Sequence, residues 1–329
     1  MNKGFKALVV SEEGGKFIRR VTERKIDDLP GGDVLINVKY SSLNYKDALS
    51  ATGNKGVTRK YPHTPGIDTA GIIATSSSNK FKAGDEVLVT GYDLGMNTSG
   101  GFAEYIRVPE NWVVKLPTGL TLKESMIYGT AGFTAALSLH KIFQCSEEKI
   151  KGEVLVTGAT GGVGSLAVAM LSKNGCDVVA STGKKDKSDF LKKLGAKEII
   201  NREDVDDKSG KPLLNRRWKA AVDTVGGNIL ATVIKQMDYR SSVAACGNTY
   251  STELNTTVFP FILRGVNLLG INSAETPMDL RLKIWHKLAN EWKPDCLNEI
   301  CTECSLEQLN KKIDLILQGQ ITGRVVVII

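Results

Sequence analysis

Short runs of apolar residues, broken by glycine and proline, dominate the first part of the chain. They include KALVV, DVLINVKYSSL, TAGIIATS, AGDEVLVTG and AEYIRVP. Runs of this length, rich in β-branched residues and bounded by turn residues, are typical of β-strands. The pattern therefore predicts a small β-rich domain of the barrel type over residues 1–122.

A helical pattern follows, and beyond it the apolar runs alternate with amphipathic stretches. Thr121 and Glu124 have the spacing of a capping box, which predicts a helix start. Six apolar runs come next: EVLVTG, DVVAST, KEIINR, AAVDTVGG, SSVAACGN and NLLGINS. Strands separated by helices form doubly wound parallel sheets. We therefore predict an α/β domain over residues 123–299.

The end of the sequence combines helical patterns with one more strand. PMDLRLKIWHKLANEW and SLEQLNKKIDLILQG have helical periodicity, and GRVVVII reads as a strand. The α/β domain offers this strand no obvious partner. We expect residues 300–329 to return to the first domain and pair there.

Composition places the chain among globular proteins. Of its 329 residues, 42% are hydrophobic and 24% are charged. No apolar run approaches the roughly 20 residues that span a bilayer. The segment MNKGFKALVV lacks the apolar core and cleavage site of a signal peptide. We therefore expect a cytoplasmic protein with no membrane partner.

Charge and cysteine content narrow the classes of partner. The net charge is +7, but no polybasic block accompanies it, so nucleic-acid binding is not indicated. Cys301 and Cys304 form one C-x-x-C pair with Cys296 nearby. A structural zinc usually needs four ligands, and no second pair or histidine has suitable spacing. Reduced thiols and no metal site are expected.

The segment VTGATGGVG, residues 156–164, follows one apolar run and precedes a helical stretch. Glycine in such a turn lets backbone N–H groups and the helix N-terminus approach a phosphate. Ala159 occupies the first position of the usual G-x-G-x-x-G fingerprint, so the match is relaxed. The setting favours a dinucleotide cradle; the alternative is a turn that only joins strand to helix.

The end of the second strand bears on which dinucleotide binds. Sites for NAD carry Asp or Glu about 20 residues after the glycines, where it binds the ribose hydroxyls. This chain has Ser181, Thr182, Gly183, Lys184 and Lys185 there, and Arg202 ends the next run. Because this region has cations and lacks a carboxylate, it favours binding of a 2′-phosphate and hence of NADPH. The alternative is that Lys184 and Lys185 bind no phosphate and are only a solvated surface pair.

The segment PGIDTAG indicates whether the chain has the ligands of a catalytic zinc ion. PGIDTAG resembles the P-G-H-E-x-x-G segment of the medium-chain dehydrogenase/reductase superfamily, with Ile67 in place of the ligand histidine. SSLNYKDAL replaces the segment with the cysteine ligand, and the four-cysteine lobe is missing. We interpret His63 as a turn or surface residue, and His140 and His286 as structural. An alcohol dehydrogenase mechanism is disfavoured.

Longer segments carry a more specific resemblance. They are SSLNYKDAL, YPHTPGIDTAG, GTAGFTAAL, VTGATGGVG, AVDTVGG, FPFILRGVNLLGINS and ITGR. Together they resemble the zinc-independent quinone oxidoreductase branch of that superfamily, and within it the acrylyl-CoA reductase family. The resemblance extends essentially from end to end. It implies a GroES-like catalytic domain, a Rossmann domain, NADPH-dependent reduction of activated double bonds, and a homo-oligomer, usually a dimer.

The resemblance also implies individual site residues. Tyr45 matches a residue that meets the cofactor near the nicotinamide, and Asn44 and Asp47 are the polar candidates beside the reacting carbon. The pyrophosphate turn comprises Thr160, Gly161, Gly162, Val163 and Gly164. The 2′-phosphate site comprises Thr182, Gly183 and Lys184, to which Arg202 is added. Loops over the nicotinamide half contain Asn248, Ile262 and Ser273.

These parts predict hydride transfer to the β-carbon of an enoyl thioester such as acrylyl-CoA. Asn44, Tyr45 or a backbone N–H would stabilise the carbonyl oxygen, and Tyr45 or water would protonate the α-carbon. Asp47 is equally compatible with a positioning role. Two alternatives stay open: reduction of a quinone by the same site, and a protein that binds NADPH without turnover, as a sensor or an RNA-binding protein.

Overall fold

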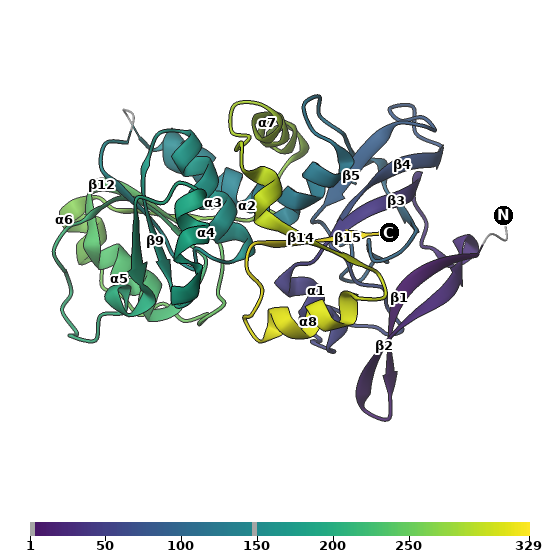
Figure 1. The fold of residues 1–329 in the computed structure, drawn as a ribbon, viewed down its shortest axis with the longest axis horizontal. Helices are drawn as coiled ribbons and strands as arrows, with labels where there is room; N and C mark the ends of the chain where they lie inside the picture. The colour runs from purple at the N-terminus through teal and green to yellow at the C-terminus, as the bar shows by residue number, and fades with distance from the viewer. Residues whose placement is uncertain (1–3, 147–149) are drawn as a thin grey trace. The chain divides into compact units, whose positions relative to one another are not determined.

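A computed structural model describes residues 4–146 and 150–329, and the chain divides into two compact units (Figure 1). The first unit comprises Met1–Thr130, Ala274–Ala289 and Asn298–Ile329; the second comprises Ala131–Ser273 and Asn290–Leu297. The sequence predicts the first boundary at residue 122, whereas the units divide after Thr130. The reason lies in helix α2 (Leu122–Gln144), which is bent at Gly129, where φ is +49°. Its first turns therefore belong to the first unit.

Helix α7 (Met278–Ala289) also belongs to the first unit, although the sequence analysis assigns it to the second. Two long-range hydrogen bonds explain this assignment. Arg281 donates from Nη1 to the carbonyl oxygen of Thr90 at 2.8 Å. The hydroxyl of Tyr128 donates to the carbonyl oxygen of Leu288 at 3.1 Å.

A mixed sheet forms the centre of the first unit, with strand order β14-β15-β3-β4-β5-β7 and β6 paired with β3. These strands are β3 (Val34–Ser42), β4 (Asp68–Ser76), β5 (Glu86–Thr90), β6 (Tyr105–Val108), β7 (Val114–Lys115), β14 (Cys301–Ser305) and β15 (Arg324–Ile328). The short helices are α1 (Tyr45–Ala51) and α8 (Leu309–Leu317). Strand β15 pairs antiparallel with β3 and parallel with β14, so the C-terminal strand lies in the sheet of the first unit.

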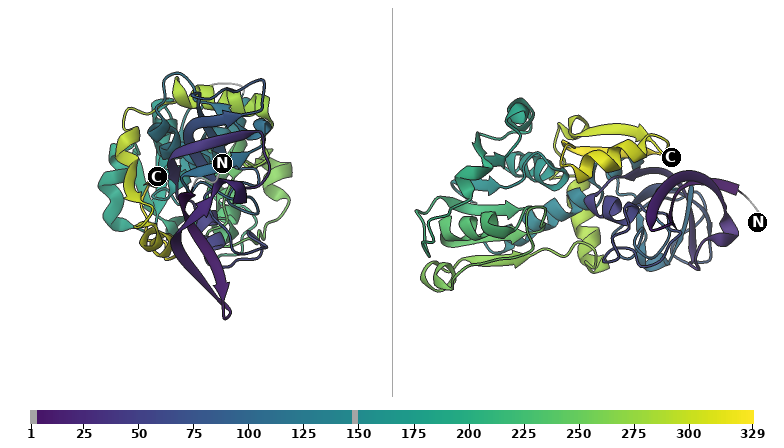
Figure 2. Two further views of the ribbon diagram at one scale, coloured as in Figure 1. Left: turned by 90° about the vertical axis from the view of Figure 1, so that its right-hand side faces the viewer. Right: turned by 90° about the horizontal axis from the view of Figure 1, so that it is seen from below.

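Strands β1 (Gly4–Glu13) and β2 (Lys16–Lys25) form a separate antiparallel hairpin that projects from the rest of this unit (Figure 2). The hydrophobic pattern of the sequence does not predict β2. Six of its ten residues are charged, so it shows no apolar alternation. A hairpin with a solvated face does not need that alternation, because backbone pairing with one neighbour defines the strand.

The second unit contains a six-stranded parallel sheet with strand order β10-β9-β8-β11-β12-β13. The strands are β8 (Glu153–Val156), β9 (Asp177–Thr182), β10 (Glu198–Asn201), β11 (Trp218–Asp223), β12 (Met237–Ala245) and β13 (Asn267–Gly270). Helices α3 (Gly162–Lys173) and α4 (Ser188–Lys193) cover one face, while α5 (Gly227–Gln236) and α6 (Phe259–Arg264) cover the other (Figure 1). The doubly wound parallel sheet is confirmed.

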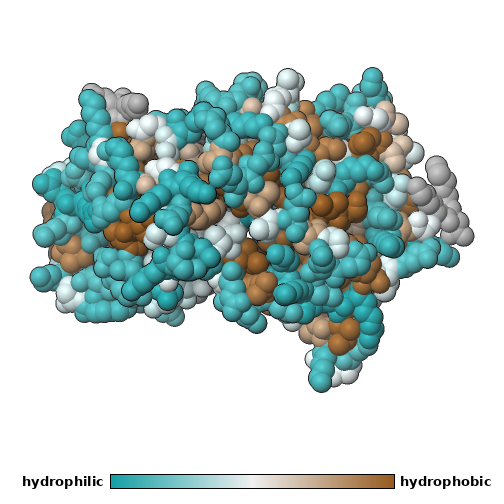
Figure 3. Space-filling view, in the orientation of Figure 1, coloured by the Kyte–Doolittle hydropathy of each residue, from teal (hydrophilic) through white to brown (hydrophobic). Residues whose placement is uncertain are grey.

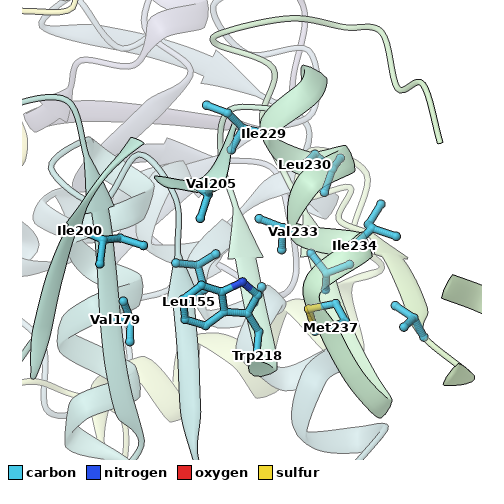
Figure 4. Close-up of a cluster of buried hydrophobic side chains, with 13 residues drawn as sticks. Leu155, Val179, Ile200, Val205, Trp218, Ile229, Leu230, Val233, Ile234 and Met237 are labelled. Carbon is cyan, nitrogen blue, oxygen red and sulfur yellow. The ribbon is translucent and has the colours of Figure 1, made fainter. Parts of the chain in front are cut away.

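Apolar side chains fill the space beneath α5 (Figure 4). Leu155, Val179 and Trp218 come from the sheet, and Val233 and Ile234 come from the helix. Trp218 also satisfies its indole N–H by donating to Oε1 of Gln236 at 2.9 Å. This core holds the parallel strands in register, so their carboxyl ends meet at one edge, the usual location of ligand sites in such sheets.

Short 3₁₀ turns lie at Ile26–Asp28, Glu110–Trp112, Lys185–Lys187, Arg202–Val205 and Leu297–Ile300. Thr121 and Glu124 form the predicted capping box before α2: Thr121 N–H donates to Oε2 of Glu124 at 2.9 Å, and Glu124 N–H donates to Oγ1 of Thr121 at 3.2 Å. Among the described residues, no helix has the length and apolar character needed to cross a bilayer.

Candidate functional site

The glycine-rich turn lies between β8 and α3, at the carboxyl edge of the parallel sheet. Gly158 has φ +58°, and a Cβ atom there would overlap Oγ1 of Thr224. A Cβ atom on Gly164 would overlap the carbonyl oxygen of Gly158. Helix α3 begins at Gly162, so its first amides have no intrahelical acceptor and can bind an anion.

The structure brings the end of β9 to this turn. The N–H of Ala159 donates to the carbonyl oxygen of Ser181 at 3.1 Å. The hydroxyls of Thr160 and Thr182 lie 3.2 Å apart, and both side chains are buried. The predicted pyrophosphate residues and the predicted 2′-phosphate residues are therefore neighbours.

Arg202 joins the same cluster from the end of β10. Strands β9 and β10 pair so that Thr182 lies beside Asn201. A Cβ atom on Gly183 would lie 2.8 Å from both Cζ and Nε of Arg202, which places the guanidinium against the Gly183 backbone.

The charges of this cluster fit a phosphate group. Lys184 is partly buried, and its burial lowers the pKa of its ammonium group. The Arg202 guanidinium is exposed and pairs with Glu203, Nε to Oε1 3.3 Å. Residues 181–183, where NAD sites carry an acid, are Ser, Thr and Gly. These groups could hold the 2′-phosphate of a dinucleotide.

The three predicted nicotinamide-side residues lie in different surroundings. Asn248 lies in the loop after β12, and a Cβ atom on Gly226 would lie 3.4 Å from its Cα. Ser273 follows β13, and its Oγ accepts a hydrogen bond from Oγ1 of Thr134 at 2.8 Å. Ile262 lies on α6 with 68% of its surface exposed, and the described contacts do not join it to the glycine turn. Its role stays a prediction.

In the first unit, the predicted catalytic residues surround the N-terminus of α1. Tyr45 begins the helix and is 41% exposed, whereas Asp47 is fully buried. The Asp47 carboxylate accepts hydrogen bonds from the N–H groups of Asn44 at 2.7 Å and Ile67 at 2.8 Å. It therefore ties the LNYKD segment to the PGID segment.

Burial raises the pKa of Asp47 to about 7, and the nearby charge of Asp68 adds to this shift. Hydrogen bonds from Asn44 and Ile67 act in the opposite direction. Both oxygens of this carboxylate accept hydrogen bonds from backbone N–H groups, Oδ1 from Gly66 and Ile67 and Oδ2 from Asn44.

Asp68 is a central residue that sequence reasoning missed. Its fully buried carboxylate accepts hydrogen bonds from Oγ of Ser42 at 2.6 Å and from N and Oγ1 of Thr130 at 2.9 and 2.6 Å. Buried Arg324 lies 3.7 Å away, Nη2 to Oδ2. The signal in the sequence is a single charged residue next to an apolar strand, in PGIDTAG and again in GRVVVII.

The side-chain amide of Asn44 is used within this network. Its Nδ2 donates to Oδ2 of Asp68 at 2.7 Å and also lies 3.3 Å from Oδ2 of Asp47. The opposite orientation would direct the amide oxygen at two carboxylates, so the neighbours determine which atom is which. Of the three predicted catalytic residues, Tyr45 is the one whose side chain reaches the surface.

The histidines include one correction. His63 is 6% exposed, not a turn or surface residue, because its backbone pairs with Val10 and its Nε2 lies 2.9 Å from the carbonyl oxygen of Gly95. His140 is buried in α2, and His286 is exposed on α7. Within the described ranges, no group of three His, Cys, Asp or Glu residues could hold a metal ion.

Comparison with known proteins identifies the family. One family model, the alcohol dehydrogenase GroES-like domain, matches residues 30–118, and another, the zinc-binding dehydrogenase, matches residues 162–289. Acrylyl-CoA reductase AcuI of Ruegeria pomeroyi is 43% identical over 98% of each chain. The chain belongs to the medium-chain dehydrogenase/reductase family. Human quinone oxidoreductase is a more distant relative, 27% identical over 77% of this chain and 76% of its own.

Solved structures of this family agree with the fold. The Bacillus subtilis protein YhfP, solved with NAD bound, is 48% identical, with a TM-score of 0.97 over 99% of this chain and 100% of that one. The yhdH oxidoreductase from Salmonella enterica, solved with NADP, is 43% identical, with a TM-score of 0.96 over 98% and 99% of the two chains. The predicted oxidoreductase, with its GroES-like domain and Rossmann fold, is confirmed.

Proposed function

We propose that this oxidoreductase uses NADPH to reduce the activated C=C double bond of an enoyl thioester such as acrylyl-CoA, without a metal ion. The observation that carries the proposal is the cluster at the end of β9, where Arg202 and Lys184 lie beside Gly183 and no carboxylate takes the ribose position. The likeness to AcuI over nearly the whole chain supports the substrate class.

The nicotinamide supplies a hydride for the β-carbon when it is bound, and one proton added at the α-carbon completes the reduction. Negative charge develops on the thioester oxygen and needs a hydrogen-bond donor. We assign the Tyr45 hydroxyl to hold this proton, because its side chain is exposed while Asn44 and Asp47 are bonded within the chain. Asp47 and Asp68 keep the start of α1 in place, so Tyr45 needs little reorganisation.

The choice between NADPH and NADH depends on the chain's own residues, because YhfP was solved with NAD and its Salmonella relative with NADP. The Arg202 guanidinium lies against Gly183, where the 2′-phosphate is predicted to bind, and Ser181, Thr182 and Lys184 flank that glycine in the chain. A carboxylate, which would repel that phosphate, is absent from residues 181–185. NADPH is the cofactor that this arrangement supports.

Steady-state oxidation of NADPH with acrylyl-CoA and with benzoquinone tests the proposal. We expect turnover with the thioester and a lower KM for NADPH than for NADH. Turnover with benzoquinone alone would reject the thioester and favour the quinone alternative. Binding of NADPH without turnover of either substrate would favour a sensor.

A second copy of the chain is the partner that the second unit supports. Strand β13 ends the sheet order, and its Leu268 side chain is 38% exposed. Val258, Phe259 and Leu263 on and before α6 are more exposed still. By contrast, the face drawn in Figure 3 is mostly hydrophilic, with hydrophobic side chains in scattered small patches. An edge strand with apolar neighbours is a template for pairing. Sedimentation should show a dimer that Leu268→Lys weakens and Leu282→Lys, on exposed α7, leaves intact.

A further inference from the structure

A buried carboxylate lies behind the glycine-rich turn of the second unit. Asp223 ends β11, the strand next to β8, and is fully buried. Its Oδ1 accepts a hydrogen bond from Oγ1 of Thr157 at 2.7 Å. Its Oδ2 accepts hydrogen bonds from the N–H of Gly226 at 2.7 Å and of Val225 at 3.3 Å. Thr157 immediately precedes Gly158, so one carboxylate connects the glycine turn to the turn after β11.

Thr157 and Thr224 lock these two turns together. The N–H of Thr224 donates to Oγ1 of Thr157 at 3.1 Å, and Oγ1 of Thr224 donates to the carbonyl oxygen of Thr157 at 2.9 Å. The Thr224 hydroxyl occupies the space that a Cβ atom on Gly158 would need. The conformation at Gly158 therefore depends on the position of Thr224, and Asp223 holds both threonines through Thr157.

The same turn also supports the loop after β12. The N–H of Cys246 donates to the carbonyl oxygen of Asp223 at 3.0 Å. The N–H of Tyr250 donates to the carbonyl oxygen of Val225 at 2.9 Å. Asn248 lies between these two anchors. Both backbone segments predicted to contact the dinucleotide on this side of the sheet are thus attached to residues 223–226.

We propose that Asp223 is a positioning residue for the dinucleotide: through Thr157 and Thr224 it sets the shape of the turn that receives the pyrophosphate. The proposal rests on the proposed cofactor. Asp223 would not touch the phosphates; it would act through the backbone of Thr157–Gly158.

These hydrogen bonds require a side chain at position 223 that accepts with both of its terminal atoms and carries no hydrogen on either. All three partners of the carboxylate donate to it, so an asparagine would direct its NH₂ group at the Thr157 hydroxyl or at the two backbone N–H groups. The Thr157 oxygen already accepts from Thr224 N–H, which would leave its own proton without an acceptor. Burial raises the pKa of Asp223, and the Thr157, Gly226 and Val225 hydrogen bonds oppose this shift.

Binding of two ligands to a set of variants tests the proposal. NADPH engages the pyrophosphate turn, whereas adenosine 2′-monophosphate carries only the phosphate expected at Lys184 and Arg202. The variants are Asp223→Asn, Thr157→Val and Thr157→Ser, with Thr232→Val as the matched control. Thr232, within α5, is also buried, and its hydroxyl accepts a hydrogen bond from the N–H of Asp207 at 2.9 Å rather than from the turn residues.

We expect Asp223→Asn and Thr157→Val to raise the Kd for NADPH by about tenfold, as loss of one buried hydrogen bond implies. Thr157→Ser keeps the hydroxyl and should retain most of the affinity, and Thr232→Val should bind as the wild type does. The Kd for adenosine 2′-monophosphate should stay within about twofold in all four.

Equal weakening of both ligands would overturn the proposal, because it would mark a general loss of structure. Unchanged NADPH binding in Thr157→Val would overturn it too, even if Asp223→Asn did not fold. Failure of the wild type to bind NADPH at all would reject the proposed cofactor and this inference with it. Wild-type binding with no effect of the variants would reject the inference alone.

Discussion

Replacing Arg202 by alanine tests the assignment of the 2′-phosphate site. The guanidinium lies against Gly183, beside Lys184, at the end of β9. A charge-assisted hydrogen bond to phosphate contributes about 1.5–3 kcal/mol. The Arg202 side chain is 63% exposed, which favours the lower end of that range, and its exposed pairing with Glu203 offers little competition. A loss of about 1.5 kcal/mol corresponds to roughly a tenfold higher Kd.

Fluorescence titration of the purified protein with NADPH and with NADH measures this effect directly. Arg202→Ala should raise the Kd for NADPH about tenfold and leave that for NADH nearly unchanged. Arg216→Ala is the matched control, since Arg216 is a partly exposed arginine of the same unit that pairs with Asp238. Equal losses for the two cofactors, or equal effects of the two substitutions, would refute the assignment. High salt should also weaken NADPH binding more than NADH binding.

Three further changes test the first unit. Tyr45→Phe should lower kcat with acrylyl-CoA by about 100-fold or more while the Kd for NADPH is unchanged; a normal kcat would exclude the hydroxyl as proton donor. Asp47 has a folded pKa of about 7 against an ordinary 3.8, so the stability that this carboxyl confers is complete below about pH 3.8 and is lost as the pH rises from there through 7. The Tm of the wild type should therefore fall more than that of Asp47→Asn between about pH 5 and pH 8, and parallel curves would contradict the raised pKa. Gly129→Ala should lower the free energy of unfolding by about 2 kcal/mol or more, because its φ is +49° and a Cβ atom would overlap Asp68; denaturant titration measures this, and a wild-type midpoint would contradict it.

Local patterns of apolar and polar residues predicted most of the fold. The inner strands β9, β8, β11 and β12 are largely buried and read as apolar runs, while the edge strands β10 and β13 are more exposed; all six were predicted. Strands β2 and β14 were not predicted, because their sequences KFIRRVTERK and CTECS have too many charged or polar residues to indicate a buried face. The compact units divide after Thr130 and not at residue 122, because the bend at Gly129 depends on a conformation that helical periodicity does not reveal.

The candidate site also contains some residues that a local sequence pattern could predict and others that it could not. The glycine turn and the residues after β9 are close in sequence and follow a motif whose geometry is local, so sequence reasoning could name them. Asp68, Arg324 and Asp223 were missed because their partners lie far along the chain: Arg324 bonds Ser42 across 282 positions, and Asp223 bonds Thr157 across 66. Only folding brings these groups together, and a buried charge in an apolar strand was the one hint available.

The return of β15 to the first unit has a consequence for how the protein is made. Strand β3 and strand β15 are neighbours in the sheet, yet almost the entire chain separates them in order of synthesis. All six strands of the intervening parallel sheet precede residue 271, so this sheet can form while translation continues. Until Arg324–Ile328 emerge from the ribosome, β3 lacks one neighbour and buried Asp68 lacks its arginine. The segment that contains Tyr45 therefore cannot complete its packing before the last strand has been made.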